Sequence, residues 1–353
     1  MLTKNINAET PCFQLILFAL FFCGCAASDQ SVKPQVFVFS DINIDQGDPD
    51  DRQSLVHLLW YANELDIRGI VPDRWNAQGL EACNLVIDAY AQDYATLKKA
   101  DYPTPESLRE KVATDKPAAM KLFQQAASDD SSPLYVLVWG NMDVFKDALM
   151  QQPSLSKNIR LITIGTGLML EANIQHIPAS WEKLPPCQQL NWNGKGRNVI
   201  YEDEQFNNMW WLEINWTYEG MFSGEEPKEM FEALSTYGAL GQHIQEVVKN
   251  QEWARYFRVG DTPSVLYVID ATHNLDDPTQ SSWAGKFVKP LPDTRPNYYT
   301  DFSGSVTWDY ANPCATWENH REVRDLAAGT LEKERPDMYQ ALLDKLDGIY
   351  SED

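Results

Sequence analysis

The sequence has little positive charge and few cysteines. Against 51 aspartates and glutamates stand 29 lysines and arginines, so the 353 residues carry a formal charge of -22. Because this charge repels the phosphates of nucleic acids and of anionic lipids, a nucleic-acid partner is disfavoured. The six cysteines show no CxxC spacing and no neighbouring histidine pattern, so a zinc site is not indicated. A neutral, cationic or carbohydrate-like ligand fits better, although the charge also suits a surface that only keeps the protein soluble.

Long apolar runs are scarce as well. The run 13–22 is too short to span a bilayer, and it ends shortly before a small residue and Cys25. This pattern resembles a bacterial lipoprotein signal, which predicts a signal peptide over 1–24, lipidated Cys25 as the first mature residue and a polar tether over 25–34. The protein would then cross the inner membrane and be held by its lipid in the periplasm or at the cell surface. The alternative is simple cleavage after a small residue.

From residue 35 to 353, short apolar runs alternate with segments of helical spacing, without an internal repeat or an interdomain linker. This alternation predicts one α/β domain, doubly wound, with a mostly parallel central sheet. The segment 264–269 fits either a strand or a buried helix. The predicted strands are 35–40, 67–71, 134–139, 160–164, 198–201 and 210–214, and the predicted helices are 54–62, 85–97, 118–127, 144–150 and 336–350.

Ligands of such sheets bind beyond the carboxyl ends of the strands. Three turns rich in Asp, Asn or Glu follow predicted strands, at 40–51, 140–143 and 213–215. The agreement between the expected topology and the residue types predicts a site at this edge of the sheet.

The turn 41–51 places five carboxylates within eleven residues. Crowded carboxylates repel one another, and a hard divalent cation such as Ca²⁺, which takes six to eight oxygen ligands, relieves this repulsion. An EF-hand is excluded because the glycine is one position late and Arg52 stands where the final glutamate is required. The alternative is a solvated acidic loop.

The order strand, Asp-rich turn ending in Asp50 and Asp51, then helix resembles the start of the nucleoside hydrolases. More closely, the chain resembles the nucleoside-hydrolase-like domain of the DUF1593 family, also called the Sde182-type cellulose-binding family, of the ribonucleoside hydrolase-like superfamily. The matching segments span roughly residues 36–290 in order, and they are 40–42, 48–56, 62–70, 139–141, 211–221 and 260–267.

The resemblance implies one Ca²⁺ ion and a water that an aspartate activates to cleave a glycosidic bond. It implies Asp45, Asp51 and Asp261 as metal ligands, together with a backbone carbonyl near Met142. The turn is longer here than in the family, so the aspartate that acts as base stays open among Asp45, Asp48 and Asp41, in that order.

The resemblance also implies the residues that bind the substrate. Asp50 would hold sugar hydroxyls, Glu213 and Asn215 resemble the family's sugar-binding pair, and Asn76 and Asn141 lie in loops that line its pocket. Trp210, Trp211, Trp216 and Trp283 are candidates for stacking on a sugar or base, with core packing as the alternative.

One departure from the family concerns the substrate. Many nucleoside hydrolases place a histidine directly before the late metal-binding aspartate, where it helps to protonate the leaving base. Gly260 stands there in this chain, and His273 is the nearest substitute. The departure and the expected location favour glycans or glycosides over nucleosides.

The sequence thus predicts a Ca²⁺-dependent hydrolase of an N-glycosyl, glycan or glycoside bond. The competing hypotheses are a carbohydrate-binding surface lipoprotein without turnover and a structural protein with a solvated acidic loop. The oligomeric state is open, and a homo-oligomer is one option.

Overall fold

The computed structural model describes residues 33–44, 49–165, 196–306 and 320–351. These residues belong to one compact unit that begins at Lys33. The predicted signal peptide, Cys25, Asp45 and Asp48 lie outside the described residues. Within the described ranges, no helix combines the length and the apolarity needed to cross a bilayer.

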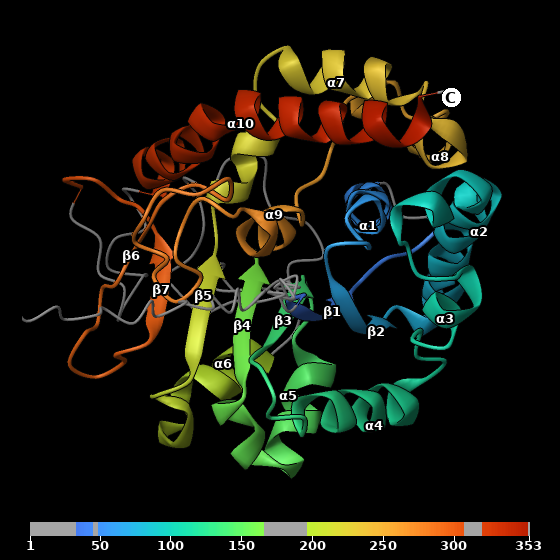
Figure 1. Cartoon of the computed structure of the whole chain (residues 1–353). Coiled ribbons are helices and arrows are strands. Elements are labelled where there is room, and N and C mark those ends of the chain that lie inside the picture. Colours follow the sequence, from blue (N-terminus) through green and yellow to red (C-terminus); the bar gives the residue numbers. More distant parts are fainter. Residues whose placement is uncertain (1–32, 45–48, 166–195, 307–319, 352–353) are drawn as a thin grey trace, which may run out of the picture. The chain divides into compact units, whose positions relative to one another are not determined.

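The described strands form one seven-stranded sheet in the order β2-β1-β3-β4-β5-β7-β6. All neighbouring strands are parallel except β6 and β7, which are antiparallel. This confirms the predicted mostly parallel α/β sheet (Figure 1). The strands are β1 (Gln35–Ser40), β2 (Asp66–Pro72), β3 (Leu134–Trp139), β4 (Ile159–Ile164), β5 (Trp210–Ile214), β6 (Phe287–Val288) and β7 (Tyr298–Asp301).

Helices cover both faces of this sheet. In Figure 1, α4, α5 and α6 gather on one side of the strands, and α1, α2 and α7 to α10 on the other. The helices are α1 (Asp50–Trp60), α2 (Gly79–Leu97), α3 (Pro105–Arg109), α4 (Lys116–Ala127), α5 (Asp143–Gln151), α6 (Gly196–Glu202), α7 (Glu226–Leu234), α8 (Gly238–Val247), α9 (Pro263–Ile269) and α10 (His320–Tyr350).

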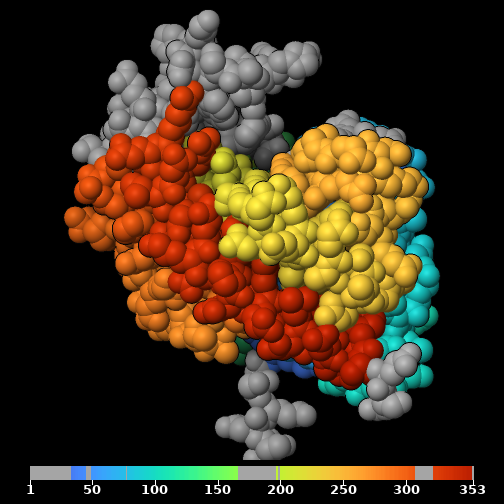
Figure 2. Space-filling model, turned by 90° about the horizontal axis from the view of Figure 1, so that it is seen from above, coloured from blue at the N-terminus to red at the C-terminus, as the bar shows by residue number. Residues whose placement is uncertain are grey.

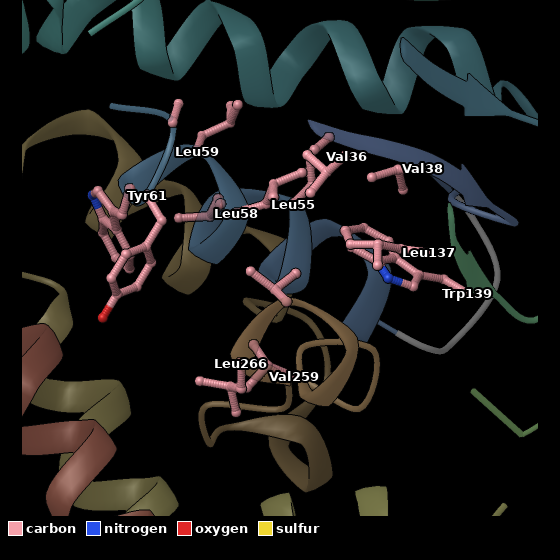
Figure 3. Close-up of a cluster of buried hydrophobic side chains, with 14 of the residues drawn as sticks. Val36, Val38, Leu55, Leu58, Leu59, Tyr61, Leu137, Trp139, Val259 and Leu266 are labelled. Atoms are coloured by element: carbon pink, nitrogen blue, oxygen red, sulfur yellow. The ribbon is translucent and has the colours of Figure 1, made fainter. Parts of the chain in front are cut away.

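The strand β1 shows how the two layers are built. All six of its residues are buried, as expected for a central parallel strand. Because successive side chains of a strand point to opposite faces, Val36 and Val38 join the core under α1, whereas Phe37 and Phe39 join the core under α4 and α5. Figure 3 shows Leu55 of α1 beside Val36. Side chains of the two layers therefore hold β1 from both sides.

The connections place a topological switch point beside β1. The chain leaves β1 for β2 on one side, and β3 then pairs with β1 on the other side. At such a point two loops diverge and leave a crevice beyond the carboxyl ends of the strands. The acidic turn 41–51 leaves β1 at this crevice.

Two segments differ from the sequence-based expectation, and the structure decides a third that the sequence left open. The predicted strand 198–201 lies in α6, where Ile200 is buried and Val199 is exposed, because a four-residue apolar run cannot distinguish a strand from a helical face. The ambiguous segment 264–269 is helix α9. The last helix begins at His320, well before the predicted start at Pro336, and Pro336 lies within it on an exposed position.

Candidate functional site

The first turn of α1 supplies two carboxylates to the crevice. The strand β1 ends at Ser40, whose hydroxyl donates to Asp51 Oδ1 at 2.5 Å, and the Asp51 N–H donates to Asp50 Oδ1 at 3.1 Å. The amide groups of a helix N-terminus favour negative charge at this position. Asp51 is 7% exposed and Asp50 is half-buried, so both carboxylates are fixed beside the end of β1.

Asp261 joins them from a distant part of the sequence. It lies two residues before α9 and is 6% exposed. Carboxylate oxygens of Asp50, Asp51 and Asp261 all lie within 4.8 Å of one another. The structure therefore brings together two of the residues that the resemblance implies as metal ligands, Asp51 and Asp261, and adds Asp50 to the same group. We call these three residues the carboxylate cluster.

The carboxylate cluster favours a cation. Burial raises the pKa of Asp51 well above its usual range, and the charges of Asp261, Asp41 and Asp50 raise it further, against the hydrogen bond from Ser40. Carboxylates this close must either keep a proton or share a positive charge. Three converging carboxylates are a donor set that fits a hard cation such as Ca²⁺ or Mg²⁺, since both prefer oxygen ligands.

Asp41, a candidate for the base, is engaged elsewhere. Its carboxylate forms an ion pair with Arg74 at 2.5 Å, which opposes its use as a proton acceptor. The neighbouring Asp73 follows β2, and burial, together with the charge of Asp41, raises its pKa to about 8. Arg74 acts in the opposite direction on Asp73, so these three residues form a mixed-charge group beside the carboxylate cluster.

A cavity of about 560 Å³ opens over the cluster. Its wall combines carboxylates, two arginines and two aromatic rings. Sequence reasoning did not single out the arginines, because nothing in the pattern around them differs from that of a surface residue. Tyr218 and Glu219 lie in a segment that matches the family and were not assigned a role. The lining residues are Asp41, Asn43, Asp50, Asp51, Arg74, Gly140, Ile164, Gly165, Tyr218, Glu219, Phe222, Arg258 and Asp261.

The predicted sugar-binding pair does not line this cavity. Glu213 is fully buried, and Arg197 donates to its two oxygens at 2.7 and 2.8 Å, while the Tyr298 hydroxyl donates to one of them. The side-chain amide of Asn215 donates to Thr300 Oγ1 at 3.1 Å. These side chains hold β5 and β7 together. The sequence interpretation fails here because their position at a strand end does not show which way they point.

Four other predicted residues also lie outside the cavity lining. Asn76 is exposed in the short helix η1 (Trp75–Ala77), and Asn141 Oδ1 accepts the Asp143 N–H at 2.8 Å at the start of α5. The Met142 carbonyl accepts the Lys146 N–H at 2.8 Å, as the first hydrogen bond of α5, and its side chain is in the core. His273 packs edge-on against Tyr267 with ring centroids 4.6 Å apart, beyond the far end of α9 from Asp261.

The structure explains why residue 260 is glycine. A Cβ atom there would lie 2.6 Å from Asp50 Oδ2 and 2.8 Å from the Phe222 ring. The space that a side chain at this position would need is therefore filled by a member of the carboxylate cluster and by the cavity wall. A histidine at residue 260 would displace Asp50.

Solved structures share this fold at low sequence identity. A nucleoside hydrolase-related hypothetical protein from Saccharophagus degradans, associated with carbohydrate metabolism, is 17% identical over 91% of this chain and 73% of its own, with a TM-score of 0.57. An inosine-guanosine nucleoside hydrolase is 11% identical over 91% of this chain and 100% of its own, with a TM-score of 0.50. The inosine-uridine preferring nucleoside hydrolase of Bacillus anthracis is 14% identical over 82% and 99%, with a TM-score of 0.45.

No curated protein matches the chain. The sequence model of one family matches residues 35–287, which include the carboxylate cluster and the strands β1 to β5. The chain belongs to this family, which is described as cellulose-binding Sde182, nucleoside hydrolase-like domain.

Proposed function

We propose that the protein is a Ca²⁺-dependent hydrolase of a glycosidic bond in a glycan or glycoside, acting outside the cytoplasm and held at a membrane by a lipid on Cys25. The observation that carries the catalytic part is the convergence of Asp50, Asp51 and Asp261 within 4.8 Å at the floor of a cavity large enough for a sugar. The description of the family as cellulose-binding supports a glycan ligand. The location rests on the N-terminal signal pattern alone.

The three carboxylates of the cluster would have different roles. Asp51 and Asp261 are the more buried and would hold the ion, whereas the half-buried Asp50 would also accept hydrogen bonds from sugar hydroxyls. A bound divalent cation would neutralise the carboxylate cluster and make a water molecule at the site more acidic. We assign the base that removes the water's proton to Asp45 or Asp48 of the acidic turn, because Asp41 is paired with Arg74.

Glu219 is suited to protonate the leaving group. It lines the same cavity, and burial raises its pKa, although Arg324 at 3.6 Å lowers it. A carboxyl group with a raised pKa keeps its proton to a higher pH and can donate that proton to the departing oxygen of a glycoside. Such a group makes a histidine before Asp261 unnecessary. The buried Glu213 is not placed for this role, because both of its oxygens accept hydrogen bonds from Arg197 and it does not line the cavity.

The test is hydrolysis of cello-oligosaccharides, aryl glycosides and nucleosides by the purified protein, with Ca²⁺ or with EDTA. We expect release of reducing sugar from glycans or glycosides, its loss in EDTA, and its loss in Asp51→Asn and Asp261→Asn. Asp337→Asn is the matched control, because Asp337 is an exposed carboxylate on α10 that does not act on Glu219. Glu219→Gln should slow the hydrolysis of aryl glycosides with poor leaving groups more than the hydrolysis of those with good leaving groups, since only poor leaving groups need an acid.

The second candidate function is carbohydrate binding without turnover. It is favoured by the description of the family and by the glycine at residue 260. Saccharide binding that requires Ca²⁺ and Asp51, with no product from any substrate, would establish this function in place of the hydrolase.

A further inference from the structure

One tryptophan stands out on the surface. Trp253, in the short helix η7 (Glu252–Ala254), is 59% exposed, more than any other large hydrophobic side chain among the described residues. By contrast Trp210, Trp211 and Trp216, which the sequence offers as stacking candidates, are at most 5% exposed and belong to the interior. A single exposed ring is common on proteins, so its meaning depends on its neighbours.

The side chains next to Trp253 extend from the surface to the wall of the cavity. The guanidinium carbon of Arg258 lies 5.4 Å from the Trp253 ring centroid, 5.6 Å from that of Tyr256 and 4.3 Å from that of Phe222. The Phe222 ring is 6.2 Å from Tyr256 and 5.8 Å from Tyr218. Arg258, Phe222 and Tyr218 line the cavity. A continuous series of rings around one guanidinium therefore connects the exposed Trp253 with the carboxylate cluster.

Both chain segments that form this series are held in place. The backbone N–H of Arg258 donates to Gln53 Oε1 of α1 at 2.6 Å. The segment with Tyr218 and Phe222 is held from two sides, by Asp301 of β7 at the turn after β5 and by Arg335 of α10, which donates to the Gly220 carbonyl at 2.5 Å. Figure 2 shows α10 in red lying across this face of the molecule. Backbone segments held in this way lose little freedom when a ligand binds.

The chemistry of the series fits a neutral sugar chain. One face of a pyranose ring presents C–H groups that pack on an aromatic ring, and its hydroxyl groups accept hydrogen bonds from a guanidinium. A nucleic-acid strand would use the same rings, but the charge of -22 opposes it. We infer that Trp253, Tyr256 and Arg258 form a second subsite for the further sugar units of a glycan whose end occupies the cavity. This inference rests on the proposed saccharide specificity of the cavity.

The test measures affinity against chain length. Glucose, cellobiose, cellotetraose and cellohexaose are titrated into the protein by calorimetry at saturating Ca²⁺. We expect the affinity of the wild-type protein to rise with length, and the ratio of the cellohexaose to the cellobiose affinity to fall about tenfold in Trp253→Ala. Trp253→Phe, which keeps a ring, should restore most of the ratio.

The control is Met150→Ala. Met150 is also exposed, at 39%, but it lies at the C-terminal end of α5, which starts at the cavity edge and returns along the sheet. In Met150→Ala, the ratio of the cellohexaose to the cellobiose affinity should equal that of the wild type. A wild-type affinity that does not grow with length, or an equal loss for both saccharides in Trp253→Ala, would overturn the second subsite while leaving Ca²⁺-dependent binding in the cavity intact. Absence of binding for every saccharide would overturn the proposed specificity as well.

Discussion

At the carboxyl ends of the strands, the carboxylates beside β1 have opposite surroundings from those beside β5 and β7. Beside β1, Asp50, Asp51 and Asp261 crowd one another within 4.8 Å. Beside β5 and β7, Glu213 receives the Arg197 guanidinium and a tyrosine hydroxyl, and Asp301 accepts hydrogen bonds from the backbone N–H groups of residues 215–217 and from a threonine hydroxyl. Both halves of this sheet edge contain buried carboxylates, Asp51 and Asp261 on one side and Glu213 and Asp301 on the other.

The difference lies in where the compensating charge originates. The protein itself supplies an arginine and a set of oriented N–H groups to the β5 and β7 side, so those carboxylates stabilise the edge. On the β1 side, burial raises the pKa of Asp51, and its neighbours, which are mainly other carboxylates, raise this pKa further. Burial of like charges without compensation costs several kcal/mol, so the β1 side gains stability only from a proton or from a cation. The carboxylates beside β5 and β7 stabilise the fold, whereas we propose that those beside β1 bind a cation.

Removal of Arg197 should show the largest effect on the structural side. Arg197→Met leaves Glu213 as an uncompensated buried charge, so we expect the free energy of unfolding to fall by about 3–5 kcal/mol. Lys228→Met breaks the exposed Lys228–Glu225 pair and should cost less than about 1 kcal/mol. Chemical unfolding of both variants measures the difference. Equal losses would mean that the Arg197–Glu213 pair contributes no more than a surface pair.

The fold of this edge could be predicted from the sequence because strands and helices here follow simple patterns. Residues 36–39 are apolar and all six residues 35–40 are buried, and the switch in spacing after residue 50 marks a helix. The strand β7 was not predicted, because 298–301 is a short run of tyrosine, threonine and aspartate without an apolar pattern. The same shortness led to the wrong assignment of 198–201.

The site could be predicted only in part. The pairing of Asp51 with Asp261 follows from the resemblance, and both side chains do lie together. Glu213 was misjudged because its partner Arg197 is 16 residues away, and no local pattern links the two. Arg258 was missed because its significance lies in its contact with Phe222, which comes from another segment of the chain. Trp253 was missed because its significance lies in its contact with Arg258.

Calcium should separate the two halves most directly. At a free Ca²⁺ concentration of 100 times the dissociation constant, we expect the free energy of unfolding to rise by about 2.7 kcal/mol. Asp51→Asn and Asp261→Asn should abolish this increment. Asp301→Asn should lower stability but keep the increment, because Asp301 belongs to the structural side. Thermal unfolding with Ca²⁺ and with EDTA measures the stability increment. An increment that survives in Asp51→Asn would contradict the proposed ligand set.

The pH dependence of Asp73 extends the comparison to β2. Among the described residues, neither carboxylate oxygen of Asp73 accepts a hydrogen bond. Its pKa is about 8 against an ordinary value of 3.8, raised by burial and by Asp41. A raised folded-state pKa means that its contribution to stability is complete below pH 3.8 and is lost as the pH rises through about 8.

Asp73→Asn should therefore be more stable than the wild type at high pH only. We expect a gain of about 1–3 kcal/mol above pH 8 that vanishes near pH 4, because the neutral amide resembles the protonated acid. Asp337→Asn, an exposed position on α10, is the control and should follow the wild type at every pH. Chemical unfolding across this range, in EDTA, measures the gain. A pH-independent difference would show that Asp73 does not titrate there.

The smallest expected effect tests how tightly the β1 side is built. A methyl group at residue 260 would press on Asp50 and Phe222, so Gly260→Ala should cost about 1 kcal/mol and weaken Ca²⁺ binding by moving one carboxylate of the cluster. Gly329→Ala is its matched control in α10, where a Cβ meets nothing within 4 Å, and it should stabilise the helix by about 0.5–1 kcal/mol. Unfolding and Ca²⁺ titration of the two variants check both signs. If Gly260→Ala bound Ca²⁺ as the wild type does, Asp50 would bind only the sugar, and the ion would depend on Asp51, Asp261 and the acidic turn.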